Sequence, residues 1–255
     1  MTLIVDDTNW QELVEADQIA GLPPGCLPRQ TEIGGLECAA VYAEHVELIP
    51  ESQWMDRARE MIADRAFIGD RIQFDPATHF QNGLGFCWAY SLCQALEAER
   101  ELMGLPPELL APESLAECVN YRNAGYYLDR ALEYAAKNGI ARRQFVPQYK
   151  LNPKDWQAGW KEDRANFVPL EWWDLGGKNV WAETVTLLLN GMGCYVGLDW
   201  WSHAVFYDRL VIDGQRLGVH TPNTHGPGKD VNLFGSKAIP SMGSFGIRSV
   251  TYSKL

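Results

Sequence analysis

Four side chains of complementary chemistry occur along the chain in the order Gln81, Cys87, His203 and Asn223. Cys87 opens a segment with helical periodicity, and the amides at a helix N-terminus favour the thiolate, the nucleophilic form of cysteine. His203 begins a β-like run and is a candidate general base for this thiol. Asn223 could orient the imidazole, and Gln81 could donate an amide hydrogen bond to an oxyanion. These residues together indicate a thiol-dependent hydrolase.

The elements that must position these residues change in type along the chain. Helices are predicted from apolar periodicity at residues 10–20, 52–66, 87–103, 112–120, 127–138 and 181–190. Runs of β-forming residues occupy 36–49, 194–200, 203–212, 215–221 and 245–250. Asp213-Gly214 predicts a hairpin turn between two of these runs. Most helices precede the main antiparallel strands, so the sequence predicts an α+β protein with two lobes and a cleft between them.

The segments around the candidate residues are similar to those of the papain-like cysteine peptidases. QNGLGFCWAYS at 81–91 resembles that family's QGxCGSCWAFS segment around the nucleophile, and Asn223 lies within the family interval of about 130–150 residues after the cysteine. Further likenesses follow in the family's order: APESLAEC at 111–118, NAGY at 123–126, SHAV at 202–205, PNTHG at 222–226 and FGIR at 245–248. The resemblance covers roughly residues 49–250.

This resemblance implies a two-lobe fold, with a helical N-terminal lobe, an antiparallel β C-terminal lobe and the active-site cleft between them. It also implies a Cys-His-Asn site made of Cys87, His203 and Asn223, with Gln81 as the oxyanion donor. The backbone of Gly125 would pair with an extended peptide. Further substrate-binding positions implied by the family are Ala124, Trp88, Ser202 and Ala204.

Several positions depart from the family pattern. Leu84 and Arg122 stand where a family disulfide would be, so the bridge is lost as a unit, which suits a reducing compartment. Phe86 replaces a small residue beside the nucleophile. His225 replaces the Trp that shields the Asn–His pair, and we therefore expect the imidazole to be less well protected from water.

Residues 1–48 precede the part that resembles a mature enzyme, which would span residues 49–255. This N-terminal extension is shorter than the family's inhibitory prosegment. It is either a shortened inhibitory segment that blocks the cleft or a docking element unrelated to inhibition. Its apolar residues Trp10, Leu13, Ile19 and Leu36 are expected to pack on the main domain.

Composition limits the partners. There are 33 acidic and 22 basic residues, for a net charge of −11, which disfavours nucleic acid and anionic membrane as partners. The N-terminus carries no visible signal peptide.

The six cysteines are scattered and are interpreted as free thiols. A metal site built from His203, His220 and His225 matches no zinc spacing, so neither a metal nor another cofactor is expected.

Two functions remain open from the sequence. The first is a cysteine peptidase or amidase that acts on a peptide or protein substrate in a cytoplasmic or otherwise reducing compartment. The second is a papain-fold structural or binding protein with little or no activity, for example a component of a virion or other assembly. A bacterial or phage origin fits the lean, disulfide-free chain. The four catalytic residue types favour the enzyme.

Overall fold

The computed structural model describes residues 2–37, 39–72, 74–75, 77–226 and 229–251. Its α-helices are α1 (Trp10–Ile19), α2 (Tyr42–His45), α3 (Glu51–Asp64), α4 (Ile68–Arg71), α5 (Cys87–Leu102), α6 (Leu128–Asn138), α7 (Trp160–Arg164) and α8 (Val180–Leu189), and short 3-10 helices cover Pro112–Val119, Pro153–Asp155 and Gly235–Ala238. Its strands are β1 (Leu3–Val5), β2 (Cys26–Leu27), β3 (Ala39–Val41), β4 (Tyr126–Tyr127), β5 (Pro169–Asp174), β6 (Cys194–Leu198), β7 (His203–Tyr207), β8 (Arg209–Asp213), β9 (Arg216–Thr221), β10 (Val231–Phe234) and β11 (Ser244–Val250).

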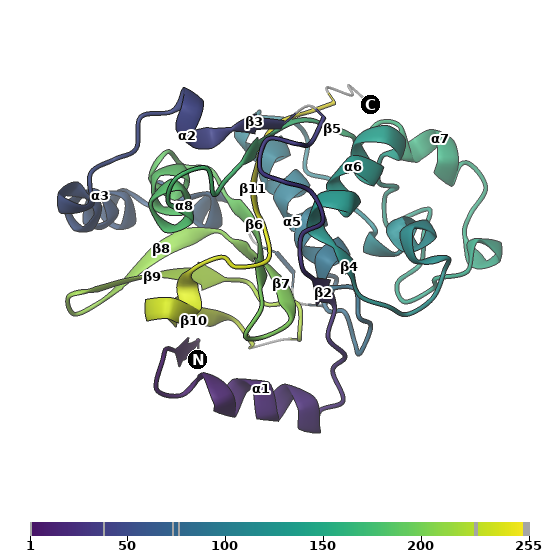
Figure 1. Ribbon diagram of the computed structural model, residues 1–255. Coiled ribbons are helices and arrows are strands. Elements are labelled where there is room, and N and C mark those ends of the chain that lie inside the picture. Colours follow the sequence, from purple (N-terminus) through teal and green to yellow (C-terminus); the bar gives the residue numbers. More distant parts are fainter. Residues whose placement is uncertain (1, 38, 73, 76, 227–228, 252–255) are drawn as a thin grey trace.

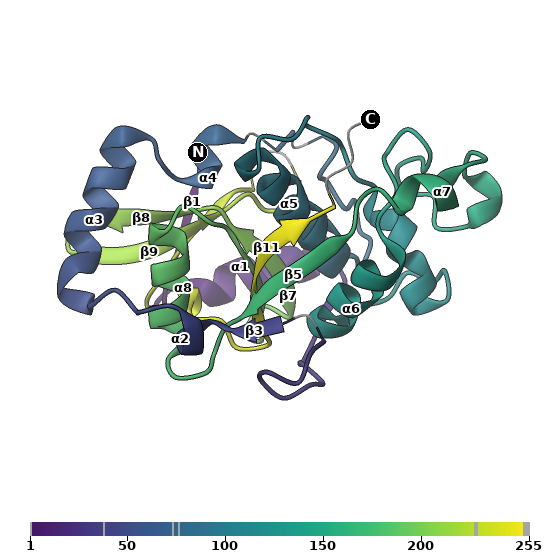
Figure 2. The ribbon, with the colours of Figure 1, turned by 90° about the horizontal axis from the view of Figure 1, so that it is seen from above.

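The elements separate into two lobes, as Figures 1 and 2 both show. Helices α5, α6 and α7 lie on one side, and strands β8, β9 and β10 lie with α3 and α8 on the other. Each side has its own cluster of buried apolar residues, one centred on α5 and the other between α8 and the strands. The predicted α+β class is therefore confirmed.

The strands form two larger sheets and one small one. The order is β3-β5-β11-β6-β7 in the first and β1-β10-β9-β8 in the second, and β2 pairs with β4 alone. The run predicted as one strand over 203–212 divides at Asp208, so that β7 belongs to the first sheet and β8 to the second. The hairpin predicted at Asp213-Gly214 joins β8 to β9, with Gly214 at a φ of 59°.

Helix α5 lies at the centre of the helical lobe. All its residues from Cys87 to Arg100 are buried, including Trp88, Leu92 and Leu96. It packs on β6, β7 and β11, so its apolar face covers the first sheet. This packing fixes the first turn of α5 beside the start of β7.

The N-terminal residues cross both lobes. In Figure 1 the purple trace leaves β1 at the edge of the second sheet, forms α1 beneath the β lobe, and then rises between the lobes through β2 toward β3. β1 pairs in parallel with β10, β2 with β4, and β3 with β5. Leu13 and Leu36 are buried as predicted, but Ile19 is 88% exposed, so its predicted burial is wrong.

The β-like run over 36–49 is mostly not a strand. Only Ala39–Val41 pairs with β5, and the chain then turns into the short helix α2. Tyr42 in this helix is buried, and its hydroxyl accepts a hydrogen bond of 3.0 Å from Asn190 Nδ2. Packing against the end of α8 therefore overrides the local β propensity.

Candidate active site

Cys87 is the first residue of α5, as the sequence predicts. The preceding residue, Phe86, forms no side-chain cap, so the first amides of the helix stay available to an anion. The turn before Cys87 is held by Trp88, whose indole Nε1 donates to the carbonyl oxygens of Gly85 at 3.1 Å and Ala124 at 3.2 Å. Asn123 Oδ1 accepts from the Gly85 amide at 2.6 Å. These bonds tie the turn before Cys87 to the segment that leads into β4.

The sulfur of Cys87 faces the start of β7. Its Sγ accepts a hydrogen bond from the Ala204 amide at 3.3 Å. The Ala204 carbonyl in turn accepts from Ser91 Oγ of α5 at 2.9 Å. Helix and strand are thus locked together at the residue that follows His203, which brings the two predicted catalytic residues into one site.

His203 and Asn223 lie in hydrogen-bond contact. The ring Nε2 lies 3.0 Å from Asn223 Oδ1, which also accepts from the His225 amide at 3.3 Å. In the tautomer that donates through Nε2, the Nδ1 atom keeps its lone pair and is the one that can take a proton from a thiol.

Two aromatic side chains cover the His203 ring. Its centroid lies 4.6 Å from the Trp201 ring and 3.9 Å from the His225 ring, and only 2% of His203 is exposed. The expectation that His225 leaves the imidazole less protected is therefore wrong in this structure. Trp201, a residue that the sequence analysis did not single out, supplies much of the cover.

Gln81 is fully buried and connects the nucleophile's loop to the Asn223 loop. The backbone amide of Gln81 donates to the Thr224 carbonyl at 2.9 Å, and the side-chain Oε1 accepts from Thr224 Oγ1 at 2.6 Å. Its Nε2 donates to the Leu84 carbonyl at 2.6 Å. A side-chain amide carries two N–H groups, and the bond to the Leu84 carbonyl uses one of them.

The N-terminal extension passes directly over this site. The Ser202 carbonyl accepts hydrogen bonds from the amides of Gly25 and Cys26, both at 3.1 Å, and the Tyr126 amide donates to the Gly25 carbonyl at 3.0 Å. A Cβ atom added to Gly25 would lie 2.5 Å from Cys87 Sγ. Residues 22–27, which we call the covering segment, therefore occupy the space above the nucleophile.

Two of the five predicted substrate-binding positions, Ser202 and Gly125, contact the covering segment. Ser202 and the Gly125–Tyr126 backbone contact it directly, and a Cβ on Gly125 would lie 2.9 Å from the Gly25 carbonyl oxygen. Trp88, Ala124 and Ala204 have a different place, because their described hydrogen bonds hold the nucleophile's turn and sulfur.

Burial determines the protonation of Cys87 and His203 in this covered state. Removal from water raises the pKa of the Cys87 thiol to about 12, although the Ala204 amide hydrogen bond partly opposes this. A helix N-terminus contributes about 0.3–1 kcal/mol, less than one pKa unit, so burial prevails over the helix effect. Burial also lowers the pKa of His203 well below 6.5, and the neighbouring His225 lowers it further. The covered site holds a neutral thiol and a neutral imidazole.

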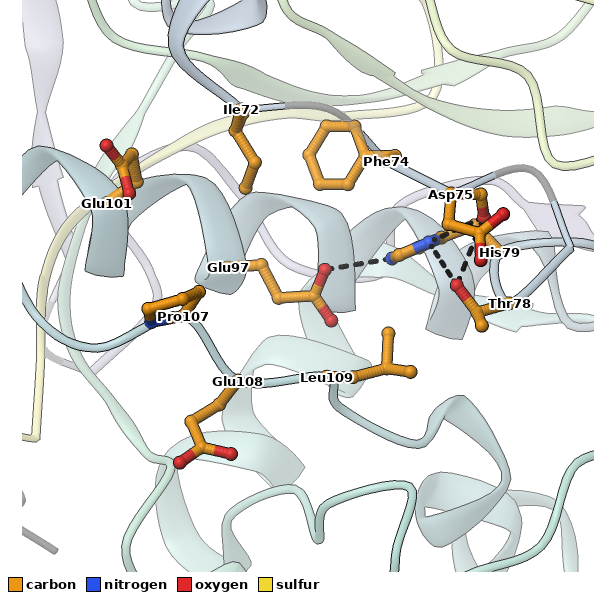
Figure 3. A pocket seen from close by; sticks show the side chains of 10 residues that line it. All are labelled: Ile72, Phe74, Asp75, Thr78, His79, Glu97, Glu101, Pro107, Glu108 and Leu109. Atoms are coloured by element: carbon orange, nitrogen blue, oxygen red, sulfur yellow. Dashed lines mark hydrogen bonds and ion pairs between the residues drawn. The ribbon is translucent and has the colours of Figure 1, made fainter.

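A hollow that shares no residue with those described above is lined in part by Glu97 and Glu101 of α5 (Figure 3). Its lining includes Asp75, Glu97, Glu101 and Glu108, and its volume is about 340 Å³. His79 points into this group and its Nε2 lies 2.8 Å from Glu97 Oε2, a contact that raises the pKa of the imidazole against the opposing effect of burial. His79 is only 7% exposed, so it is a buried member of this group rather than a surface residue.

Other features of the described residues bear on function. Five cysteines are free thiols, and Cys38 lies outside the described residues. His220, considered above as a metal ligand, instead pairs through Nδ1 with Asp208 at 2.7 Å. No cluster of three or more His, Cys, Asp or Glu side chains in the described residues is arranged to hold a metal. None of the described helices has the length and apolar character to cross a membrane.

Comparison with known proteins gives a likeness of structure only. No protein-family model matches the sequence, and no curated protein matches it either. Digestive procathepsin L 3 of Tenebrio molitor larval midgut superposes with a TM-score of 0.55 at 14% identity, over 68% of this chain and 65% of that one. The chain thus spans just under two thirds of that protein's length.

Two plant proteins give similar results. The bromelain protease of Ananas comosus, in complex with the E64 inhibitor, matches with a TM-score of 0.54 at 15% identity, over 68% of this chain and 92% of that one. The proform of the ragweed pollen allergen Amb a 11, a cysteine protease, matches with a TM-score of 0.57 at 15% identity, over 93% of this chain and 74% of that one. With a helical lobe, a β lobe and these structural neighbours, the chain has the papain-like cysteine protease fold.

Proposed function

We propose that this protein is a thiol-dependent hydrolase that cleaves amide bonds in extended peptides and is held latent by its covering segment. One observation carries the proposal: an extended piece of polypeptide, Gly25–Leu27, lies across Cys87 beside the His203–Asn223 pair. The backbone groups that bind this piece are those that a peptide substrate would need.

The first half of the reaction would form an acyl-enzyme. Cys87 Sγ attacks the carbonyl carbon, and its proton passes to His203 Nδ1. The negative charge that develops on the carbonyl oxygen is stabilised by the Cys87 amide and by an N–H of Gln81 Nε2. His203 then gives its proton to the leaving amine, and the C–N bond breaks to leave a thioester on Cys87.

The second half would regenerate the enzyme. A water molecule loses a proton to His203 Nδ1 and attacks the thioester carbonyl. The C–S bond breaks, the acid product leaves, and the proton returns to Cys87. Asn223 keeps the imidazole edge toward the sulfur in both halves, because its Oδ1 holds Nε2 at 3.0 Å.

The covering segment would keep this chemistry switched off. Cys87 has no exposed surface and His203 has 2%, so a substrate carbonyl has no access to the sulfur. β2 runs parallel to β4, with Cys26 opposite Tyr126. Displacement or removal of residues 22–27 would rehydrate the thiol and imidazole, and the burial that opposes their charged forms would be lost.

A second candidate is a binding or structural protein that keeps the site permanently covered. The observation in its favour is that β1 and β3, on either side of the covering segment, are built into the two larger sheets. Such anchoring at both ends makes displacement of the segment costly.

A thiol probe can distinguish the two candidates. The full chain is treated at neutral pH with an epoxide directed at nucleophilic cysteines, after displacement of the segment by the substitution Gly25→Ala, and the labelled cysteine is mapped by mass spectrometry. Selective labelling of Cys87, lost on His203→Ala, supports the hydrolase. Labelling spread over the other cysteines, or unaffected by His203→Ala, supports the structural candidate.

A further inference from the structure

The carboxylate of Asp17, near the end of α1, is held by side chains from the domain that follows the N-terminal extension. Its Oδ2 accepts a hydrogen bond of 2.7 Å from Trp201 Nε1 and lies 2.9 Å from His225 Nδ1. Asp17 and His225 are each 7% exposed and Trp201 is 6% exposed. A buried carboxylate needs hydrogen bonds and a partner that can carry positive charge, and this site supplies both.

This site adjoins the reacting groups. Asp17, Trp201 and His225 line a hollow of about 220 Å³ together with His203 and the upstream part of the covering segment, Leu22–Pro24. Within the hollow, His225 Nε2 is buried without a hydrogen-bond partner in the described residues. A buried imidazole nitrogen left unpaired is uncommon in proteins and leaves polar capacity for a ligand.

The groups that hold Asp17 are fixed by contacts that do not depend on it. The His225 amide donates to Asn223 Oδ1, and its ring lies 3.9 Å from the His203 ring. The Trp201 ring stacks on Trp200 at 5.3 Å and meets His225 edge to face at 5.7 Å. Trp200 in turn donates through Nε1 to the Lys237 carbonyl at 3.2 Å, so the two donors would keep their places when the Asp17 carboxylate is withdrawn.

The positions of Trp201 and His225 place these donors beside the leaving half of a bound substrate. His203 must protonate the leaving amine, so the leaving half of the peptide lies on the His203 side of the sulfur. Trp201 and His225 cover that same ring. The β4 backbone, which holds Cys26 and Leu27, lies on the other side of Gly25 along the segment and would hold the acyl half.

We propose that Trp201 and His225 form a carboxylate-binding subsite on the leaving-group side of the scissile bond, which Asp17 fills while the covering segment is in place. This inference rests on the proposed function, because it assigns a substrate class to the same site. The substrates would carry a carboxylate in the leaving half, either as an acidic side chain or as a free C-terminus. Charge-assisted hydrogen bonds of this kind are expected to favour a carboxylate over its amide by about tenfold or more.

Binding is measured first, separately from turnover. The full chain carries Asp17→Ala and Gly25→Ala to open the site, and Cys87→Ser to prevent hydrolysis. Two matched pairs of probes are titrated: N-acetyl-Gly-Asp-amide against N-acetyl-Gly-Asn-amide, and N-acetyl-Gly-Gly against its C-terminal amide. A tighter Kd for the acid in the first pair identifies a side-chain carboxylate, and in the second pair a free C-terminus. Equal Kd values in both pairs overturn the subsite.

Control variants identify the donors. Trp201→Phe and His225→Phe keep a ring while removing the N–H, and each should abolish the preference for the acid. If the preference for the acid survives in each of these two variants, the assignment of the donors is overturned. Acetate provides a check on folding: it should raise the melting temperature of the Asp17→Ala chain, but not that of Asp17→Ala combined with His225→Phe. If acetate stabilises both chains equally, the subsite is likewise overturned.

Turnover then separates this inference from the proposed function. The same peptides are offered to the Asp17→Ala, Gly25→Ala chain with Cys87 intact. Hydrolysis of the acid over the amide by about tenfold in kcat/KM supports both. A binding preference without hydrolysis leaves the subsite standing and removes the hydrolase, whereas hydrolysis without preference does the reverse.

Discussion

Gly25 and Cys87 come so close that a methyl group on Gly25 would lie 2.5 Å from the nucleophilic sulfur and 3.0 Å from the Gly85 carbonyl oxygen. Only a residue without a side chain can cross the sulfur at this distance. The covering segment and the nucleophile are therefore matched in shape, and the match depends on a single glycine.

Replacing Gly25 with Ala should open the site. The new Cβ cannot be accommodated between Cys87 Sγ and Gly85, and overpacking of this kind costs about 1–3 kcal/mol. We expect alkylation of Cys87 by iodoacetamide to become several-fold faster, as followed by mass spectrometry of the modified peptide. Glu15→Ala, on the exposed face of α1, is the matched control and should leave the rate unchanged. An unchanged rate in a folded Gly25→Ala chain would show that the segment does not limit access.

The pH dependence of alkylation should differ between covered and open protein. Burial raises the pKa of Cys87 to about 12 in the covered state, so its alkylation rate should still be rising at pH 10. In the Gly25→Ala chain the thiol regains water, and its rate should level off at a lower pH. Rates for Cys87 alone, measured from pH 6 to 11, provide the test, and coincident profiles would refute it.

The low pKa of His203 predicts a loss of stability in acid. Its pKa in the folded protein lies well below the ordinary 6.5. As the pH falls below about 6.5, the unfolded chain binds a proton at this residue that the folded chain does not, so the free energy of unfolding decreases. His203→Gln should lack this part of the decrease.

Urea unfolding of both chains between pH 4 and 8 isolates the effect of His203. The raised pKa of His79 acts in the opposite direction, but it contributes equally to the two chains and cancels in the difference. A difference between wild type and His203→Gln that does not vary with pH would contradict the account.

The sequence predicts the grouping of the four candidate side chains better than it predicts the path of the N-terminal extension. Cys87 and His203 stand where helical and β periodicity begin, and these two boundaries coincide with the starts of α5 and β7. Gln81 and Asn223 are indicated by their side-chain chemistry and again by the family resemblance, and the structure brings their two loops together through Thr224. These four residues needed no knowledge of the N-terminal extension.

The path of the N-terminal extension could not be predicted from local sequence patterns. β1, β2 and β3 are two or three residues long, and each exists because a distant strand pairs with it. Asp17 has no local signal that distinguishes it from the other acidic residues of α1. Its role appears only when Trp201 and His225, far along the chain, lie beside it.

His203 and Asn223 should differ in their effect on turnover. In the Gly25→Ala background, His203→Ala removes the group that moves the proton, which is worth roughly 10²–10⁴ in rate. Asn223→Ala removes only the 3.0 Å contact that orients the ring, while Trp201 and His225 still pack on it. Its loss in kcat should be smaller. A greater loss for Asn223→Ala than for His203→Ala would contradict this division of roles.

The central claim is that Cys87 performs amide hydrolysis once the covering segment is displaced. The most direct measurement is the hydrolysis of an extended-peptide library by the Gly25→Ala chain, compared with the same chain carrying Cys87→Ser and with wild type. The account predicts cleavage by Gly25→Ala, much slower cleavage by wild type, and none by the Cys87→Ser chain. Cleavage that persists after Cys87→Ser, or its absence from a folded Gly25→Ala chain whose Cys87 is readily alkylated, would contradict the account.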